Sequence, residues 1–436
     1  MIQVREYALL TTDSSCTPSM DLGVISKDTF EWLMGVQKTW KDKVPLFKIE
    51  GHHCIKLESY VGYLQSPKGE SIEILPKIES KSPTDTELLK IRQQLRDMLL
   101  VSMKIKPREA SAATVQTHKM PLHEWILTQF LSELVRLVRY GLRFDYQSIE
   151  EESRYIRGQL NQTRQSRQTP DRATWFHIKH DIFTPNRIEN RLLKTALNYV
   201  LKLTKNPDNW RIANELSHQL SEIEPLLFPV KDLGKWRNSK LMQRYETIKP
   251  WCEIIIHKLN PQFQKGNANG ISLLFPMERL FENYVAHWLQ KSKQSEASLK
   301  KQSASQHLLR HAPISDTEKW FELRPDLLLT MSDCSYVMDT KWKLLDDSQI
   351  DVKYKLSQQD MYQMFAYGHF YMAGKGDLML IYPAHSQFLK PLPKFSYNNE
   401  LHIWVVPFDL KDRQLVRGDW CNSFPVLSAP VMDYSP

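Results

Sequence analysis

The first 80 residues alternate short apolar runs with turn-forming residues, which is the pattern of β-structure. The clearest case is a pair of apolar-rich runs at residues 60–64 and 71–75, separated by a Pro- and Gly-containing turn at residues 66–69. Such runs around a turn predict a β-hairpin, and Pro76 is expected to end its second strand or to place it at a sheet edge. Residues 1–83 are therefore predicted to form a β-rich N-terminal domain.

From residue 84 the apolar residues recur at the 3.6-residue spacing of an α-helix. The first such stripe consists of Leu88, Leu89, Ile91, Leu95, Met98, Leu99 and Met103. The second consists of Trp125, Ile126, Phe130, Leu131, Leu134, Val135 and Val138. Gly141 is expected to end the second helix, because a glycine adopts a left-handed cap at little cost. A third stripe consists of Ile188, Leu192, Leu193, Ala196, Leu197 and Val200. Residues 84–240 are therefore predicted to be mostly helical.

A segment of different character, residues 142–182, interrupts these helices. Its apolar periodicity is poor, and it carries the arginines Arg154, Arg157, Arg164, Arg167 and Arg172. The pattern predicts an exposed, arginine-rich hairpin or loop, and a solvated surface segment without function is an equal alternative. A second polar stretch, residues 291–311, is predicted to be a loop inside the last domain.

The remaining part of the chain, residues 241–436, mixes helical and strand patterns. It begins with a helix whose apolar stripe consists of Met277, Leu280, Phe281, Tyr284, Val285, Trp288 and Leu289. Glu278 and Glu282 lie one turn apart beside that stripe and share a face. Taken alone, the pair is better explained as two solvated helix carboxylates. Overall, the patterns predict a mixed α/β protein with a β-rich start, a helical middle and a mixed α/β end.

Composition narrows the class of protein. The chain has 436 residues, of which 42% are hydrophobic, so two or three domains with real cores are expected. No apolar run is long enough to span a membrane, and the start lacks the pattern of a signal peptide. The 5 cysteines are widely spaced, which argues against a disulfide framework and is consistent with a reducing cytoplasm. A formal net charge of +8 favours a polyanionic partner.

Candidate chemistry gathers on two predicted strands of the last segment. Asp326 introduces an apolar strand, and the next strand carries Asp339 and Lys341 on one face. Trp342 is expected to point away, into the core. If the two strands pair as a hairpin, two carboxylates and one ammonium meet at one point of a sheet. Carboxylate oxygens suit Mg²⁺, which activates water and neutralises charge on a phosphodiester, and the lysine stabilises the transition state.

A D-x-K triplet is a weak signal by itself, since this chain has three, which begin at Asp339, Asp351 and Asp409. Only the triplet that begins at Asp339 follows a strand introduced by Pro-Asp, at a spacing that allows the two strands to form a hairpin. Only the first also precedes a predicted helix on which Gln363 and Tyr367 lie one turn apart on a shared face. The Pro-Asp strand, the D-x-K triplet, and the Gln and Tyr of the following helix occur in an order that favours a nuclease site.

At these residues the sequence resembles the PD-(D/E)xK nuclease superfamily. Pro325-Asp326 is similar to its first element, Asp339-x-Lys341 to its second, and Gln363-x-x-x-Tyr367 to the Q-x-x-x-Y helix of RecB-type members. The resemblance implies a restriction-endonuclease-like domain over residues 241–436, with a mixed central sheet flanked by helices. It also implies that Asp326, Asp339 and Glu282 hold Mg²⁺, with Mn²⁺ able to substitute, while Glu278 remains an alternative to Glu282.

The resemblance narrows to the McrC family, the nuclease subunit of McrBC modification-dependent restriction systems. Segments similar to that family lie at residues 72–78, 141–146, 157–158, 189–194, 281–285, 324–326, 339–343, 360–364 and 380–383. The likeness extends from about residue 58 to 385. Residues 1–57 and 386–436 match nothing in the family.

The McrC resemblance also implies a partner. McrC-like proteins dock on a ring of McrB, an AAA+ GTPase, insert a finger-like hairpin into its pore, stimulate GTP hydrolysis and cut DNA. Residues 84–240 would then bind the partner, and the arginine-rich segment 142–182 is the candidate finger. The chain has no G-x-x-x-x-G-K-[ST] loop of its own, so GTP hydrolysis is expected to belong to the partner.

Three functions remain open from the sequence. The first is a cytoplasmic Mg²⁺-dependent endonuclease subunit that acts with a McrB-like GTPase on double-stranded DNA carrying 5-methylcytosine or another modified base. The second is a stand-alone RecB-like nuclease for repair or phage defence. The third is a non-catalytic activator of a ring GTPase. The complete set of Asp326, Asp339, Lys341, Glu282, Gln363 and Tyr367 favours a catalytic protein, and the absence of a motor motif favours the first function.

Overall fold

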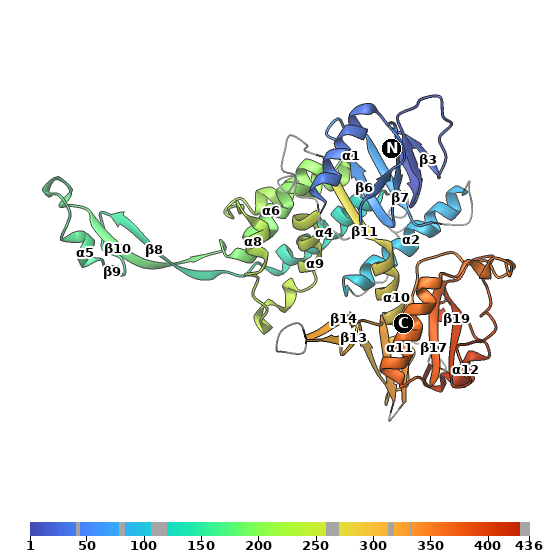
Figure 1. Ribbon diagram of the computed structural model, residues 1–436. Helices are drawn as coiled ribbons and strands as arrows, with labels where there is room; N and C mark the ends of the chain where they lie inside the picture. The colour runs from blue at the N-terminus through green and yellow to red at the C-terminus, as the bar shows by residue number, and fades with distance from the viewer. Residues whose placement is uncertain are drawn as a thin grey trace. The chain divides into compact units, whose positions relative to one another are not determined.

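The computed structural model describes residues 1–40, 44–77, 83–105, 120–258, 270–312, 318–331 and 334–427 (Figure 1). It is a mixed α/β protein, as predicted. Ile78 and the expected turn at residues 332–333 lie outside the described residues. No helix within the described ranges is long and apolar enough to cross a membrane.

The chain divides into two compact units. Unit 1 comprises residues 1–62, 70–119 and 274–436, and unit 2 comprises residues 63–69 and 120–273. This division cuts the chain differently from the predicted segments 1–83, 84–240 and 241–436. As a division into independent domains, those three segments stay a prediction.

The N-terminal part of unit 1 is rich in strands, as predicted. The elements are β1 (Ile2–Arg5), β2 (Leu9–Thr11), β3 (Leu22–Val24), α1 (Lys27–Thr39), β4 (Phe47–Ile49), β5 (Cys54–Leu57), β6 (Tyr60–Gln65) and β7 (Ser71–Leu75). One sheet has the order β3-β2-β5-β4, and in another β1 pairs in parallel with β7. The predicted hairpin is confirmed, because β6 and β7 are neighbours in their sheet. The sequence analysis missed α1, which begins after the N-cap Ser26.

The first predicted helix is α2 (Asp85–Ser102), which closes the N-terminal part of unit 1. Thr84 and Glu87 form a reciprocal capping box at its start, which satisfies two backbone N–H groups that no helical carbonyl reaches. The buried apolar stripe of α2 packs against α10 (Met277–Ser292).

The C-terminal part of unit 1 is built on one mixed sheet. Its elements are β12 (Ser298–Lys301), β15 (Leu327–Met331), β16 (Cys334–Thr340), α11 (Gln358–Met372), β17 (Gly376–Pro383), β18 (Phe395–Ser396), β19 (Leu401–Asp409), β20 (Gln414–Leu415) and α12 (Trp420–Ser423). The strand order is β12-β15-β16-β17-β19-β18, with β20 on β19. β15 and β16 are antiparallel, whereas β16, β17 and β19 are parallel. The apolar faces of α11 and these strands form a buried core around Val337, Met364 and Leu380.

The prediction that residues 291–311 form a loop is wrong. This stretch contains the end of α10, then β12 and β13 (Gln306–His311), and β13 pairs with β14 (Glu318–Leu323) in an antiparallel ribbon. The residues of β13 and β14 are nearly all exposed on both faces. A strand without a buried face has no reason to alternate apolar and polar residues, so the sequence carries no strand signal there.

Unit 2 is a helical body with a long two-stranded arm. Its helices are α4 (Leu122–Tyr140), α6 (Ile188–Leu203), α7 (Pro207–Gln219), α8 (Pro229–Leu233) and α9 (Lys249–Lys258). α4 ends at Gly141, whose φ of 89° only glycine adopts readily, as predicted. β11 (Ile271–Pro276) follows in the chain, and its last three residues belong to unit 1.

The arginine-rich segment forms the arm. β8 (Asp145–Ser153) pairs with β10 (Phe176–Thr184) over nine residue pairs, and β9 (Gln159–Leu160) and the short α5 (Gln162–Gln165) lie at the far end (Figure 1). The prediction of an exposed hairpin is confirmed. Gly158 has a φ of 68° and its Cα lies so close to the backbone of Lys179 and His180 that no side chain fits there.

Candidate active site

Register between two neighbouring strands brings the two candidate aspartates together. In the antiparallel pair, Leu327 of β15 lies opposite Met338 of β16, so the residues next to them, Asp326 and Asp339, are adjacent at the end of the ladder. Asp326 Oδ2 accepts hydrogen bonds from the backbone N–H of Thr340, at 2.8 Å, and from its hydroxyl, at 2.6 Å. The predicted hairpin therefore places both carboxylates at one point, as expected.

Asp339 is buried, with 1% of its surface exposed, and its carboxylate forms an ion pair with Lys341 Nζ at 2.6 Å. Burial, followed by the negative charge of Asp326, raises the pKa of Asp339 to about 7. For Lys341, burial disfavours the charged form, but the neighbouring Asp339 outweighs it and the pKa of the ammonium is raised. Lys341 therefore stays protonated beside the two carboxylates.

The helix α11 controls the direction of the lysine. Gln363 Oε1 accepts a hydrogen bond from Lys341 Nζ at 3.1 Å, and Gln363 Nε2 donates to the hydroxyl of Tyr367 at 2.7 Å. The Tyr367 hydroxyl in turn donates to the carbonyl oxygen of Arg324 at 2.8 Å. This chain of hydrogen bonds fixes which way the Gln363 amide points and connects α11 to the residue two positions before Asp326.

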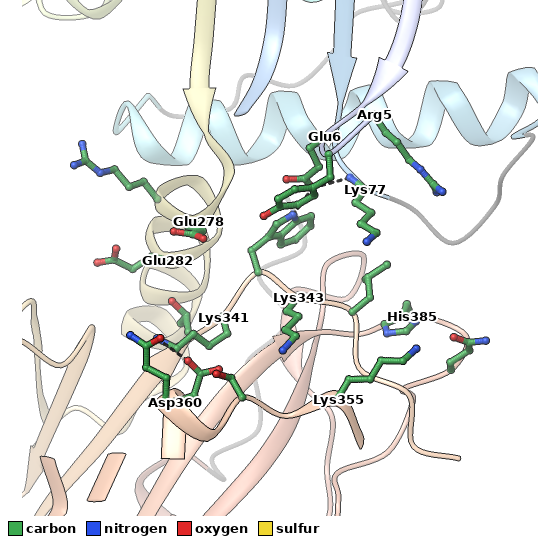
Figure 2. A pocket seen from close by; sticks show the side chains of 18 of the residues that line it. Arg5, Glu6, Lys77, Glu278, Glu282, Lys341, Lys343, Lys355, Asp360 and His385 are labelled. Atoms are coloured by element: carbon green, nitrogen blue, oxygen red, sulfur yellow. Dashed lines mark hydrogen bonds and ion pairs between the residues drawn. The ribbon is translucent and has the colours of Figure 1, made fainter. Parts of the chain in front are cut away.

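One further carboxylate of the site was not singled out from the sequence. Asp360, in the first turn of α11, has its Oδ1 3.9 Å from Lys341 Nζ (Figure 2). The available signal is spacing, because Asp360 precedes Gln363 by three residues and so shares its helix face.

Of the two helix glutamates, Glu282 faces the aspartates. Burial and then the charges of Asp326 and Asp339 raise the pKa of Glu282 to about 7, while Gln302 donates a hydrogen bond to its Oε1 at 3.0 Å. Glu278 lines the same cleft one turn earlier, and its charge acts on Glu6. The geometry therefore favours Glu282 as the third acidic residue.

Of these residues, Glu282, Asp326, Lys341, Asp360 and Gln363 line a cleft of about 1380 Å³ in unit 1 (Figure 2). Trp342 lines it as well, so the expectation that Trp342 points away into the core is wrong. β16 ends at Thr340, and strand alternation no longer governs the residues after it. The Trp342 indole N–H donates to Glu6 Oε1 at 2.5 Å. The N-terminal segment thus contributes to the cleft, which no sequence pattern indicated.

The donors of the cleft suit a hard divalent cation. Asp326, Asp339 and Glu282 supply only oxygen atoms, and their charges repel one another in a partly buried space. In the described part of the chain, no three His, Cys, Asp or Glu side chains form a ready-made metal cage. Two or three carboxylates completed by water is the manner in which Mg²⁺ is commonly held, so the residues fit this ion.

Glu6 lines another part of the cleft, and its titration provides a test of how that part is packed. Its carboxyl is 1% exposed, its Oε2 has no hydrogen-bond partner among the described residues, and burial raises its pKa from 4.5 to about 7. The folded state therefore binds the Glu6 proton more tightly than the unfolded state. The resulting stabilisation is complete below pH 4.5 and is lost as the pH rises through about 7.

The Glu6→Gln protein cannot titrate at this position. As the pH is raised from 5 to 8, we expect its free energy of unfolding to rise relative to that of the native protein by about 2 kcal/mol. Urea unfolding of both proteins at the two pH values measures this difference. A constant offset between them at the two pH values would show that Glu6 does not titrate in this range.

Comparison with known proteins assigns the chain to a family. The family model described as McrBC 5-methylcytosine restriction system component matches residues 55–383, well over half of the chain. This chain belongs to that family. The resemblance to McrC that the sequence motifs indicated is confirmed at this level. No curated protein matches this McrBC-family chain.

Comparison with solved structures shows a fold that this chain shares. One match is a chain from the refined half-complex of the tetradecameric assembly of Thermococcus gammatolerans McrB AAA+ hexamers with bound McrC, with a TM-score of 0.67, 16% identity and 94% of each chain covered. At this identity the match shows a shared fold. A second match, from the cryo-EM structure of the Thermococcus gammatolerans McrBC complex, has a TM-score of 0.49 and 17% identity, and covers 67% of this chain and 87% of that chain.

Proposed function

We propose that this McrBC-family protein is the Mg²⁺-dependent DNA endonuclease subunit of a modification-dependent restriction system, with a PD-(D/E)xK catalytic domain. The observation that carries the proposal is the joining of Asp326, Asp339 and Lys341 at the end of the β15–β16 ladder, with Gln363 bonded to the lysine. Asp326 and Asp339 would hold Mg²⁺, with Glu282 supporting it directly or through a water. The bound ion supplies charge neutralisation and a more acidic water.

The protein's own groups carry the rest of the mechanism. The Lys341 ammonium is kept protonated by Asp339 and is aimed by Gln363, so it can place positive charge beside the attacked phosphate. Charge that is already oriented stabilises the transition state without reorganisation during the reaction. Tyr367 acts indirectly, because its hydroxyl holds the Gln363 amide in the orientation that accepts a hydrogen bond from Lys341.

The partner is proposed to be a McrB-like AAA+ GTPase ring. The chain lacks a phosphate-binding loop of its own, and the related Thermococcus structure contains McrB AAA+ hexamers with bound McrC. In this proposal the arginine-rich segment 142–182, which forms most of the β8–β10 arm of unit 2, is the finger that engages the ring. Its support is its exposed length, with Tyr146 and Phe183 exposed near its base, an arrangement typical of a binding surface.

A plasmid assay tests the proposal. With Mg²⁺, GTP and the McrB-like GTPase partner present, we expect cleavage of methylated but not of unmethylated DNA. We expect little or no cleavage when any of these three is left out. Cleavage by the isolated chain, indifferent to GTP, would make it a stand-alone nuclease instead. Stimulation of GTP hydrolysis with no cleavage under any condition would make it a non-catalytic activator. Mn²⁺ in place of Mg²⁺ is expected to support cleavage.

A further inference from the structure

The N-terminal segment forms part of the cleft that holds the candidate catalytic groups. Arg5, Tyr7, Lys56 and Lys77 line the same cleft as Glu282, Asp326 and Lys341. Figure 2 shows Lys77 beside the N-terminal strands on one side of the cleft, and Lys343 and Lys355 on the opposite side. Arg5 and Tyr7 precede the residues that the family model matches, 55–383, and the proposed function assigns no role to this N-terminal wall of the cleft.

Hydrogen bonds attach this wall directly to the catalytic elements. Glu6 Oε1 accepts from the backbone N–H of Lys77, at 2.7 Å, and from the indole of Trp342, which follows Lys341 in the chain. The backbone N–H of Met277, the first residue of α10, donates to the carbonyl of Ser59 at 2.9 Å. Because α10 carries Glu282 and Trp342 follows Lys341, both of these parts of the candidate site are bonded to the N-terminal segment. The wall is therefore positioned as accurately as the site itself.

Not every positive side chain of the cleft is in an ion pair with one of its carboxylates. The acidic residues that line the cleft are Glu6, Asp21, Glu278, Glu282, Asp326 and Asp360. Arg5 is paired with Asp21, and Lys355 lies 3.7 Å from Asp346. In contrast, Lys77, Lys343 and Arg279 are exposed and form no ion pair within the described part of the chain. Lys77 instead lies over the ring of Tyr7, with its Nζ 5.6 Å from the ring centroid.

We propose that Lys77, Lys343 and Arg279 bind the phosphates of double-stranded DNA on either side of the scissile phosphate, and that residues 1–77 form one wall of the DNA channel. This inference rests on the proposed nuclease function, because the scissile phosphate must lie near Asp326 and Lys341. Lysine and arginine contacts to phosphates set the register of a protein on a duplex without reading its sequence.

The first test measures DNA binding, independently of cutting. In a Lys341→Ala background with Mg²⁺, the double substitution Lys77→Ala/Lys343→Ala is titrated with a fluorescent duplex over a range of salt concentrations. We expect affinity to fall roughly tenfold at 0.1 M salt and the slope of log K against log salt to become shallower by about 2. The matched control is Lys90→Ala/Lys411→Ala, two exposed lysines of unit 1 outside the cleft, which should leave the slope unchanged.

Charge-preserving variants separate a binding role from a folding role. Lys77→Arg/Lys343→Arg should bind the duplex as the background protein does, and GTP at millimolar concentration should not displace the DNA. The proposal is overturned if the cleft and control pairs weaken binding equally, if the arginine pair also loses binding, or if GTP competes. Because the readout is binding, these results stand whether or not the plasmid assay detects cleavage, and so distinguish failure here from failure of the proposed nuclease.

Discussion

Replacing Lys341 with alanine is expected to reduce DNA cleavage by a factor of about 10³ while leaving the stimulation of the partner's GTPase intact. The ammonium is the single positive charge bonded to both Asp339 and Gln363, and no other side chain of the described cleft can take that position. Partner engagement is proposed to use unit 2, whereas Lys341 belongs to unit 1. The two activities should therefore separate.

Cleavage of methylated plasmid and GTP hydrolysis are measured on the same assembled complex. Lys375→Ala is the matched control, because Lys375 is exposed and pairs only with Glu400, at 2.8 Å, outside the cleft. It should retain both activities. If Lys341→Ala loses GTPase stimulation together with cleavage while its thermal unfolding is unchanged, the separation of roles is wrong. If it cuts normally, Lys341 is not a catalytic residue.

The second large effect is expected on stability, from Glu124→Ala in unit 2. Glu124 is buried on α4 and accepts hydrogen bonds from three donors in the connection between α6 and α7 and from one side chain of α7. The donors are the Thr204 hydroxyl at 2.7 Å, the Lys205 N–H at 2.6 Å, the Asn206 N–H at 3.2 Å and Asn209 Nδ2 at 2.9 Å. Alanine leaves the Thr204 hydroxyl and the Lys205 N–H without an acceptor and removes one of two acceptors from each of the other donors, at a cost of about 3 kcal/mol or more.

Differential scanning calorimetry measures this loss. For a unit of this size, a destabilisation of that order lowers the melting temperature by roughly 6 °C or more. Glu222→Ala is the control, since Glu222 is an exposed glutamate of the same unit, and its melting temperature should stay within about 1 °C of the native value. A melting temperature for Glu124→Ala indistinguishable from that of Glu222→Ala would show that the network contributes little.

The sequence predicted which site residues lie together where those residues are close to one another in the chain. Pairing of Asp326 with Asp339 follows from two apolar strands that lie close together in the chain, and the Gln363–Tyr367 bond follows from one turn of helix. Each of these relations involves neighbours in the chain or in one hairpin, where periodicity determines which side chains share a face. Their catalytic roles stay predictions.

What the sequence did not reveal depends on long-range contacts. Glu6 and Trp342 are 336 positions apart, and no pattern near either residue announces that they meet. The strands β12 and β13 were missed because exposed strands need no apolar alternation. Asp360 carried a usable signal, its spacing from Gln363, but no chemistry had been assigned to it.

The discontinuity of unit 1 has a consequence for biosynthesis. The cleft needs residues from Arg5 to Gln387, whereas the body of unit 2 lies between them as residues 120–273. During translation the segment that becomes unit 2 emerges and can fold before Asp326 has been synthesised. A chain still on the ribosome, or one released early, therefore presents the arm without a complete cleft. The order of synthesis thus delays completion of the cleft until the chain has been made as far as Gln387.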